Sequence, residues 1–285
     1  MNRTYSGHKQ SVYCMCKDGL NGFFSAGSDG YIVHWKSIDS SDGELFAQVP
    51  EPIFSVAYIE ELEMILAGAQ SGKIYYLKKG APPLVLELHQ KSVFGIWVVS
   101  LDEVYTVGGD GFLHKIDWYR RKLNSIKLID NSLRTVMDLN GHLYVAGSSS
   151  EIFKLTSEFE VVHFWKAHGN SIFCLAANHQ YLVSAGRDAK IKVWNFNHQL
   201  EQSIDAHWFT IHGLAFSPNN QYFLSTSMDK TIRIWDGKTF KLLKVIEHLK
   251  FDGHKSSVNS ALWIDENTFI SCSDDNSIKC WQILS

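Results

Sequence analysis

A short pattern occurs four times along the chain. In each copy a serine stands ten residues before a tryptophan, and an aspartate stands six residues before it. A histidine lies upstream of each copy and is followed four residues later by valine or isoleucine. The copies are SAGSDGYIVHW, SAGRDAKIKVW, STSMDKTIRIW and SCSDDNSIKCW, which end at Trp35, Trp194, Trp235 and Trp281. This repetition restricts the chain to architectures built from repeated units.

Three degenerate copies lie between the first two of these tryptophans. LAGAQSGKIYYL, YTVGGDGFLHKI and VAGSSSEIFKL end at Leu77, Ile116 and Leu155. Successive ends are 42, 39, 39, 39, 41 and 46 residues apart, a mean of 41, so 285 residues hold seven repeats. Within each repeat, short alternating segments are joined by turn pairs such as Asp29-Gly30, which predicts β-hairpins rather than helices.

The last repeat is longer than the others and contains an ambiguous segment. Residues 239–250, TFKLLKVIEHLK, have an apolar spacing that a helix could use. Their position in the repeat instead predicts an outer strand for most of the segment. The extra length predicts an inserted loop at residues 248–252.

The composition is that of an ordinary globular protein, with 45% hydrophobic and 20% charged residues. The 27 Lys and Arg against 30 Asp and Glu give a net charge of −3, so nucleic acid is not an expected partner. The chain has no run of 18 apolar residues and no apolar amino-terminal segment. We therefore expect neither a membrane span nor a signal peptide.

The chain has five cysteines, an odd number with no disulfide-framework spacing: Cys14, Cys16, Cys174, Cys272 and Cys280. This usage predicts free thiols and a cytoplasmic protein. Cys14 and Cys16 lie two apart on an expected strand and therefore on one face of it. Zinc would need two further ligands at a recognisable spacing, so we expect small core residues and no metal.

The repeat resembles that of the WD40-repeat family. Gly7-His8, Gly253-His254 and the Trp235-Asp236 dipeptide match its signature, and the period matches as well. The resemblance covers the whole chain and implies an all-β fold, a seven-bladed WD40 β-propeller with four-stranded antiparallel blades around a central channel. It implies a single domain over residues 1–285, closed by an amino-terminal strand (residues 1–6) in the last blade.

The recurring His, Ser and Asp resemble the parts of a catalytic triad. Catalysis needs one such set, whereas this chain carries four, so we expect hydrogen-bonded tetrads that satisfy buried polar groups and hold strands together. The third repeat keeps His89, Thr106 and Asp110 but has Ile116 in place of Trp. The second and fourth repeats have lost the set, and we expect those blades to depend on apolar packing. The complete tetrads are His8, Ser25, Asp29 and Trp35; His168, Ser184, Asp188 and Trp194; His207, Ser225, Asp229 and Trp235; and His254, Ser271, Asp275 and Trp281.

The resemblance also implies a face for partners. In this family, partners usually dock where the turn before the innermost strand meets the turn between the second and third strands. Counting from the histidines predicts an aromatic group at the channel mouth with larger polar residues on blades 5–7, although the aromatics would also be explained if they only filled the channel. The predicted partner-binding residues are Tyr13, Phe54, Phe94, Met137, Phe173, Arg187, Trp208, His212, Met228, Asn259 and Asp274.

Three functions remain open at this point. The first is a non-enzymatic scaffold or adaptor, monomeric and without a cofactor, that binds a protein or peptide at the channel mouth. The second is a small-molecule-binding or hydrolase-like propeller enzyme in which Arg187, His212, Asn259 and Asp274 converge over the channel. The third is an architectural subunit that docks through its blade edges.

Overall fold

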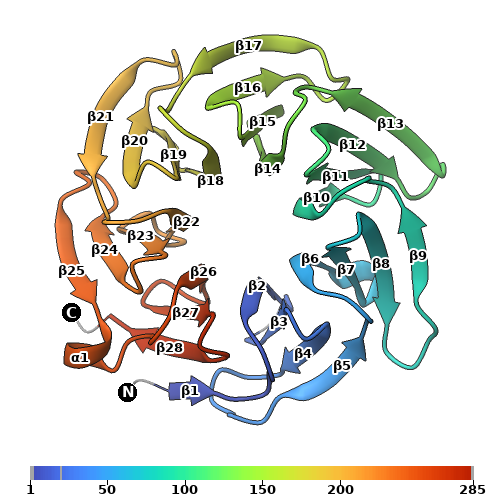
Figure 1. Ribbon diagram of the computed structural model, residues 1–285, viewed down its shortest axis with the longest axis horizontal. Coiled ribbons are helices and arrows are strands. Elements are labelled where there is room, and N and C mark those ends of the chain that lie inside the picture. The colour runs from blue at the N-terminus through green and yellow to red at the C-terminus, as the bar shows by residue number, and fades with distance from the viewer. Residues whose placement is uncertain (1–2, 20, 284–285) are drawn as a thin grey trace.

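The computed structural model describes residues 3–19 and 21–283, which form seven four-stranded antiparallel sheets around a central axis (Figure 1). The sheets are numbered blades 1–7 by their innermost strands, which are β2 (Val12–Lys17), β6 (Ile53–Ile59), β10 (Val93–Ser100), β14 (Leu133–Leu139), β18 (Ile172–Ala177), β22 (Ile211–Phe216) and β26 (Val258–Trp263). This is the seven-bladed propeller that the repeat predicts.

Tight turns join the second and third strands of each blade, and in blades 1, 3, 5, 6 and 7 these turns carry the repeated aspartates. The second strands are β3 (Phe23–Gly27), β7 (Met64–Ala69), β11 (Glu103–Gly108), β15 (His142–Gly147), β19 (Leu182–Gly186), β23 (Tyr222–Ser227) and β27 (Thr268–Ser273). The third strands are β4 (Tyr31–Trp35), β8 (Lys73–Lys78), β12 (Phe112–Asp117), β16 (Glu151–Leu155), β20 (Lys190–Trp194), β24 (Ile232–Asp236) and β28 (Ile278–Gln282). Gly30 and Gly111 follow their aspartates with φ of 70° and 81°, a conformation that glycine adopts without strain.

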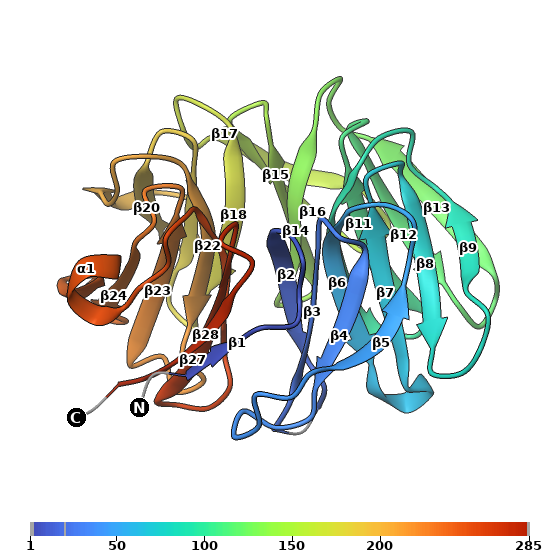
Figure 2. The ribbon, with the colours of Figure 1, turned by 60° about the horizontal axis from the view of Figure 1, so that its bottom comes forward.

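The outer strands are largely exposed and lie at the rim of the ring (Figure 1). They are β5 (Glu44–Gln48), β9 (Leu84–Glu87), β13 (Lys122–Lys127), β17 (Val161–Lys166), β21 (Leu200–Asp205), β25 (Leu242–Ile246) and β1 (Arg3–Tyr5). The blades stand along the axis, so their connecting loops gather at the two ends of the ring (Figure 2). We call the end at which the innermost strands begin the mouth face.

Closure of the ring follows the prediction. β1 pairs antiparallel with β28, and the sheet order of blade 7 is β1-β28-β27-β26. Tyr5 is fully buried against Phe23 and Trp35 of blade 1, and its hydroxyl donates to the Ile38 carbonyl over 2.7 Å. The closing strand therefore joins the last blade to the first through an aromatic cluster as well as through backbone pairing.

The apolar core lies between the blades. Seven buried clusters are found among the described residues, and each joins two neighbouring blades. Cys14 and Cys16 pack on the cluster between blades 1 and 2, as two residues on one face of a strand should, and the five cysteines are free. Burial raises the pKa of the Cys16 thiol to about 12, so this thiol stays protonated.

The ambiguous segment of the last repeat contains the outer strand β25, as its position predicts, but the strand covers five of the twelve residues rather than most of them. The predicted inserted loop is wrong in part, because His248–Phe251 form a one-turn helix, α1, at the rim beside β25 (Figure 1). Besides α1, one short 3-10 helix, η1 (Glu60–Leu62), lies in the β6–β7 connection. No helix of the described residues is long and apolar enough to cross a membrane.

Candidate functional site

The structure brings each predicted tetrad into one hydrogen-bonded chain. In blade 6 the Trp235 indole N–H donates to Ser225 Oγ over 2.9 Å. Ser225 Oγ lies 2.7 Å from His207 Nε2, and His207 Nδ1 lies 2.8 Å from an Asp229 carboxylate oxygen. The same three contacts in blades 1, 5 and 7 measure 2.8–3.1 Å. Each tetrad therefore links the loop before a blade to its second and third strands.

The protonation of these groups follows from their surroundings. Burial lowers the pKa of His207, so the ring is neutral at pH 7. Burial alone would raise the pKa of Asp229, but hydrogen bonds from His207 and Thr231 outweigh it and hold that pKa below its usual range. His207 Nδ1–H accordingly donates to the carboxylate, and Nε2 accepts from the Ser225 hydroxyl. Ser225 is fully buried, so no substrate in solvent reaches this hydroxyl.

Blade 2 corrects the expectation that blades without a tetrad depend on apolar packing alone. Glu51, two residues after the position equivalent to the histidine, accepts hydrogen bonds from the Ser71 amide, the Ser71 hydroxyl and the Tyr75 hydroxyl at 2.7–2.9 Å. The carboxylate here comes from the loop and the donors come from the turn and third strand. The sequence search missed this set because it looked for an acid in the turn.

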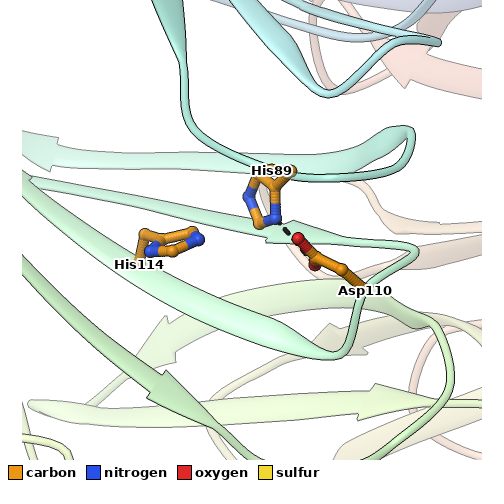
Figure 3. A group of neighbouring side chains, drawn as sticks. All are labelled: His89, Asp110 and His114. Carbon is orange, nitrogen blue, oxygen red and sulfur yellow. Dashed lines mark hydrogen bonds and ion pairs between the residues drawn. The ribbon is translucent and has the colours of Figure 1, made fainter.

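Blade 3 has a second histidine where blade 1 has Val33. His89 bonds to Asp110 at 2.9 Å and Thr106 at 3.0 Å, and the ring of His114 lies 4.5 Å from the ring of His89. Figure 3 shows the three side chains of His89, Asp110 and His114 grouped together, and their nearest possible ligand atoms lie within 4.8 Å of one another. Both nitrogens of His89 already have partners, so a metal ion would have to displace the hydrogen bond to Asp110 or the one to Thr106.

At the mouth face, one side chain from each blade contacts the next and completes a ring. On blades 1–3 the rings of Tyr13 and Phe54 stack at 5.2 Å, and Phe54 lies 5.7 Å from Phe94. On blade 4 the Arg134 guanidinium lies 4.4 Å from the ring centroids of both Phe94 and Phe173. The ring, which we call the mouth ring, consists of Tyr13, Phe54, Phe94, Arg134, Phe173, His212 and Asn259.

The placement of Met137 at the mouth is wrong. Leu133 pairs with Gly147 as Val12 pairs with Gly27, so Arg134 and not Met137 corresponds to Tyr13. Met137 is buried in the cluster between blades 4 and 5. Blade 4 has no histidine from which to count, which is why the register slipped by three residues. A serine directly before the first buried residue, as in Ser11-Val12, Ser92-Val93 and Ser132-Leu133, would have given the correct register.

Polar residues complete the mouth ring on blades 6 and 7. The His212 ring stacks on Phe173 at 5.8 Å, and its Nδ1 lies 3.3 Å from Asn259 Oδ1. The Asn259 amide donates to Asp274 over 2.8 Å and to the Val12 carbonyl over 2.9 Å, which returns the ring to blade 1. Of the four residues proposed for the hydrolase-like enzyme, three thus lie together: His212, Asn259 and Asp274.

These polar contacts differ from those of a nucleophile and its base. Ser257 Oγ is the hydroxyl next to His212 and lies 3.4 Å from its Nδ1, beyond the usual reach of such a pair. Burial lowers the pKa of His212, so its ring is neutral at pH 7. In this geometry His212 contacts Asn259, and Asn259 in turn donates a hydrogen bond to Asp274.

A group of exposed apolar side chains stands beside the mouth ring on blade 6. Trp208, Phe209 and Met228 are 83%, 58% and 52% exposed. The Met228 amide donates to the Thr210 carbonyl over 2.9 Å, so the turn of Met228 adjoins the loop that carries Trp208 and Phe209. We call Trp208, Phe209 and Met228 the blade 6 patch. Phe209, two residues after His207, was missed because the prediction took the residues one, three and five after this histidine and the residue before the turn aspartate.

The comparisons with known proteins agree with this fold. The protein-family model described as "WD domain, G-beta repeat" matches residues 1–36, 159–195, 198–236 and 245–282, which make up more than half of the chain. A solved structure, the WD40 beta propeller domain of Doa1, superposes on this chain with a TM-score of 0.87 at 20% sequence identity. The superposition covers 99% of this chain and 96% of the Doa1 chain.

Two curated relatives are also similar in sequence. The intraflagellar transport protein 80 homologs of Rattus norvegicus and Mus musculus are each 25% identical over 230 residues, or 74% of this chain. The chain aligns with 29% of the length of each relative. The four family matches, the seven blades and the tetrads lead to one conclusion: the chain belongs to the WD40-repeat family.

Proposed function

We propose that residues 1–285 act as a single propeller domain, a non-enzymatic scaffold or adaptor that binds a protein or peptide at its mouth face. The blade 6 patch is the observation that carries this proposal. Large exposed apolar side chains on loops that are anchored to a rigid propeller, beside orienting charges, are typical of protein-binding hot spots. Trp208 is fixed at its backbone, since its amide lies 3.2 Å from an Asp229 oxygen of the tetrad.

The relatives add support to this function. They are named for intraflagellar transport, which is not the name of a chemical reaction. We carry over to this chain only the role of a protein that works with other proteins, in the cytoplasm or a flagellar compartment.

A specific observation favours a second candidate, docking through a blade edge. The outer strand β17 of blade 4 exposes Val161, Val162 and Phe164. An exposed apolar outer strand offers unpaired backbone groups and apolar side chains to another chain. This is the architectural alternative, and it predicts a partner on the rim rather than at the mouth.

Matched double variants separate the two candidates. Affinity capture from cells would compare the wild type with Trp208→Ser plus Met228→Ser at the mouth and with Val162→Ser plus Phe164→Ser on β17. Circular dichroism and thermal unfolding would verify that each variant folds. The proposed function predicts that specific partners are lost from the mouth variant and kept by the β17 variant. Partners lost from the β17 variant alone would contradict it and support edge docking.

A further inference from the structure

Arg134 is a partly buried cation without an anionic partner among the described residues. Its guanidinium lies between the rings of Phe94 and Phe173, and its Nε is buried with no hydrogen-bond partner among residues 3–19 and 21–283. None of the ion pairs within that part of the chain involves Arg134. Contacts with two aromatic faces offset part of the desolvation cost but leave the Nε donor unsatisfied.

Two more cations stand on the neighbouring blades at the mouth, Arg187 on blade 5 and Lys91 on blade 3. Burial, and next the charge of the nearby Arg187, lower the pKa of Arg134, although an arginine remains protonated. Arg187 is exposed in the turn of blade 5. Lys91 lies beside Phe94, because a Cβ built on Gly109 would meet both side chains within 3.4 Å. Neither Arg187 nor Lys91 takes part in an ion pair among the described residues.

The aspartates of the mouth-face loops and turns of blades 3, 5 and 7 have other partners. Asp110 and Asp188 bond to His89 and His168, and Asp130 pairs with Lys127 at 2.9 Å. Asp274, on blade 7, accepts from Asn259 at 2.8 Å. Lys91, Arg134 and Arg187, none of them in an ion pair among the described residues, form a positive arc on blades 3–5 next to the blade 6 patch.

We propose that this arc binds the carboxylate of an aspartate or glutamate side chain in a partner peptide, and that the blade 6 patch takes a large apolar side chain of the same peptide. The assignment rests on the proposed function and specifies the partner's chemistry. A guanidinium binds a carboxylate through two parallel N–H···O bonds, which fixes orientation as well as adding affinity. The Phe94 and Phe173 rings keep the Arg134 side chain in place, so little side-chain entropy is lost on binding.

A random peptide array tests the assignment. The array would be probed with the labelled wild type, Arg134→Gln, Arg187→Gln and a matched control, Lys122→Gln, which removes the same charge from the outer strand β13. We expect the wild type and the control to select peptides with an acidic residue near a large apolar residue. Each mouth variant should bind these peptides about tenfold or more weakly, the loss expected for a hydrogen bond to a charged group. Arg187 is exposed, so its variant tests the arc even if Arg134→Gln is unstable.

The outcomes separate this assignment from the proposed function. If the wild type binds peptides that are not enriched in acidic residues, or if both mouth variants bind as the control does, the carboxylate assignment is overturned and the proposed function stands. If the wild type binds no peptide, the assignment is overturned and mouth binding of linear peptides fails with it. Displacement of acidic peptides by excess inorganic phosphate, with tighter binding of their phosphoserine counterparts, would replace the carboxylate by a phosphate.

Discussion

Single residues in this fold act mainly through buried hydrogen bonds. His207 receives one from Ser225 and gives one to Asp229, and neither neighbour has another histidine to replace it. A buried polar group that loses its partner keeps the full cost of its desolvation. The repeated His, Ser, Asp and Trp are therefore expected to contribute stability rather than chemistry.

The substitution His207→Ala tests this role. We expect a loss of about 1–3 kcal/mol in the free energy of unfolding, because Ser225 and Asp229 are left with an unsatisfied buried contact. His179→Ala is the matched control, since that histidine is exposed. Urea unfolding monitored by tryptophan fluorescence measures both. Equal midpoints and slopes for His207→Ala and the wild type would contradict the role.

Buried histidines also predict how stability depends on pH. Burial lowers the pKa of His89 and His207, and burial together with His89 lowers that of His114 to about 4. Between about pH 4 and 6.5 the unfolded chain binds more protons at these sites, so stability rises with pH. We expect the free energy of unfolding at pH 5 to be about 1–2 kcal/mol below that at pH 7. His114→Val, the residue of blade 1 at this position, should reduce the difference; a flat profile would refute the prediction.

Strands in this molecule are held by their neighbours in the next blade. The closing strand β1 is only three residues long, yet Tyr5 belongs to the cluster that joins blades 7 and 1. The aromatic ring contributes buried area, and the hydroxyl contributes one hydrogen bond to Ile38. Closure thus depends on one side chain more than on the length of the strand.

Two substitutions of Tyr5 separate these contributions. Tyr5→Ala should lower the free energy of unfolding by about 3–5 kcal/mol, the usual cost of removing a buried aromatic ring. Tyr5→Phe keeps the ring and should cost about 1 kcal/mol. Thermal and urea unfolding would measure both variants. Similar losses for the two would show that the hydroxyl, and not the packing of β1, closes the propeller.

Met137 provides a test of the corrected register of β14. Because its side chain packs between blades 4 and 5, Met137→Ala should lower stability by about 2–5 kcal/mol and leave capture of mouth-face partners unchanged. Unfolding and affinity capture on the same preparation would check both effects. Full stability of Met137→Ala together with loss of partners would contradict the corrected register and show that Met137 lies at the mouth.

The sequence predicted those elements whose signal is local or repeated. The period located the hairpins, and the closing strand followed from the family resemblance. The sequence did not identify Arg134 as a mouth residue, because blade 4 has no histidine from which positions in the repeat can be counted. The contact of Arg134 with Phe94 and Phe173 joins residues about 40 positions apart on three blades, a distance no local pattern covers. Helix α1 is a single turn and leaves no periodicity to detect.

At the scale of the whole molecule, seven similar blades carry one uneven face. The fold is shared with the Doa1 propeller at 20% identity, so the fold alone does not identify a partner. What differs between blades is the mouth: aromatic on blades 1–3, cationic along the arc on blades 3–5, and exposed apolar on blade 6. This asymmetry gives a partner one preferred orientation on an otherwise rotationally repetitive body.

Hydrogen–deuterium exchange of the protein, free and bound to a captured partner, tests mouth-face binding most directly. The account predicts slower exchange at residues 207–212 and 226–230 and at the start of β14, with β17 and β25 unchanged. Protection confined to the outer strands, with unchanged exchange at the mouth, would contradict the account and place the partner on the blade edges.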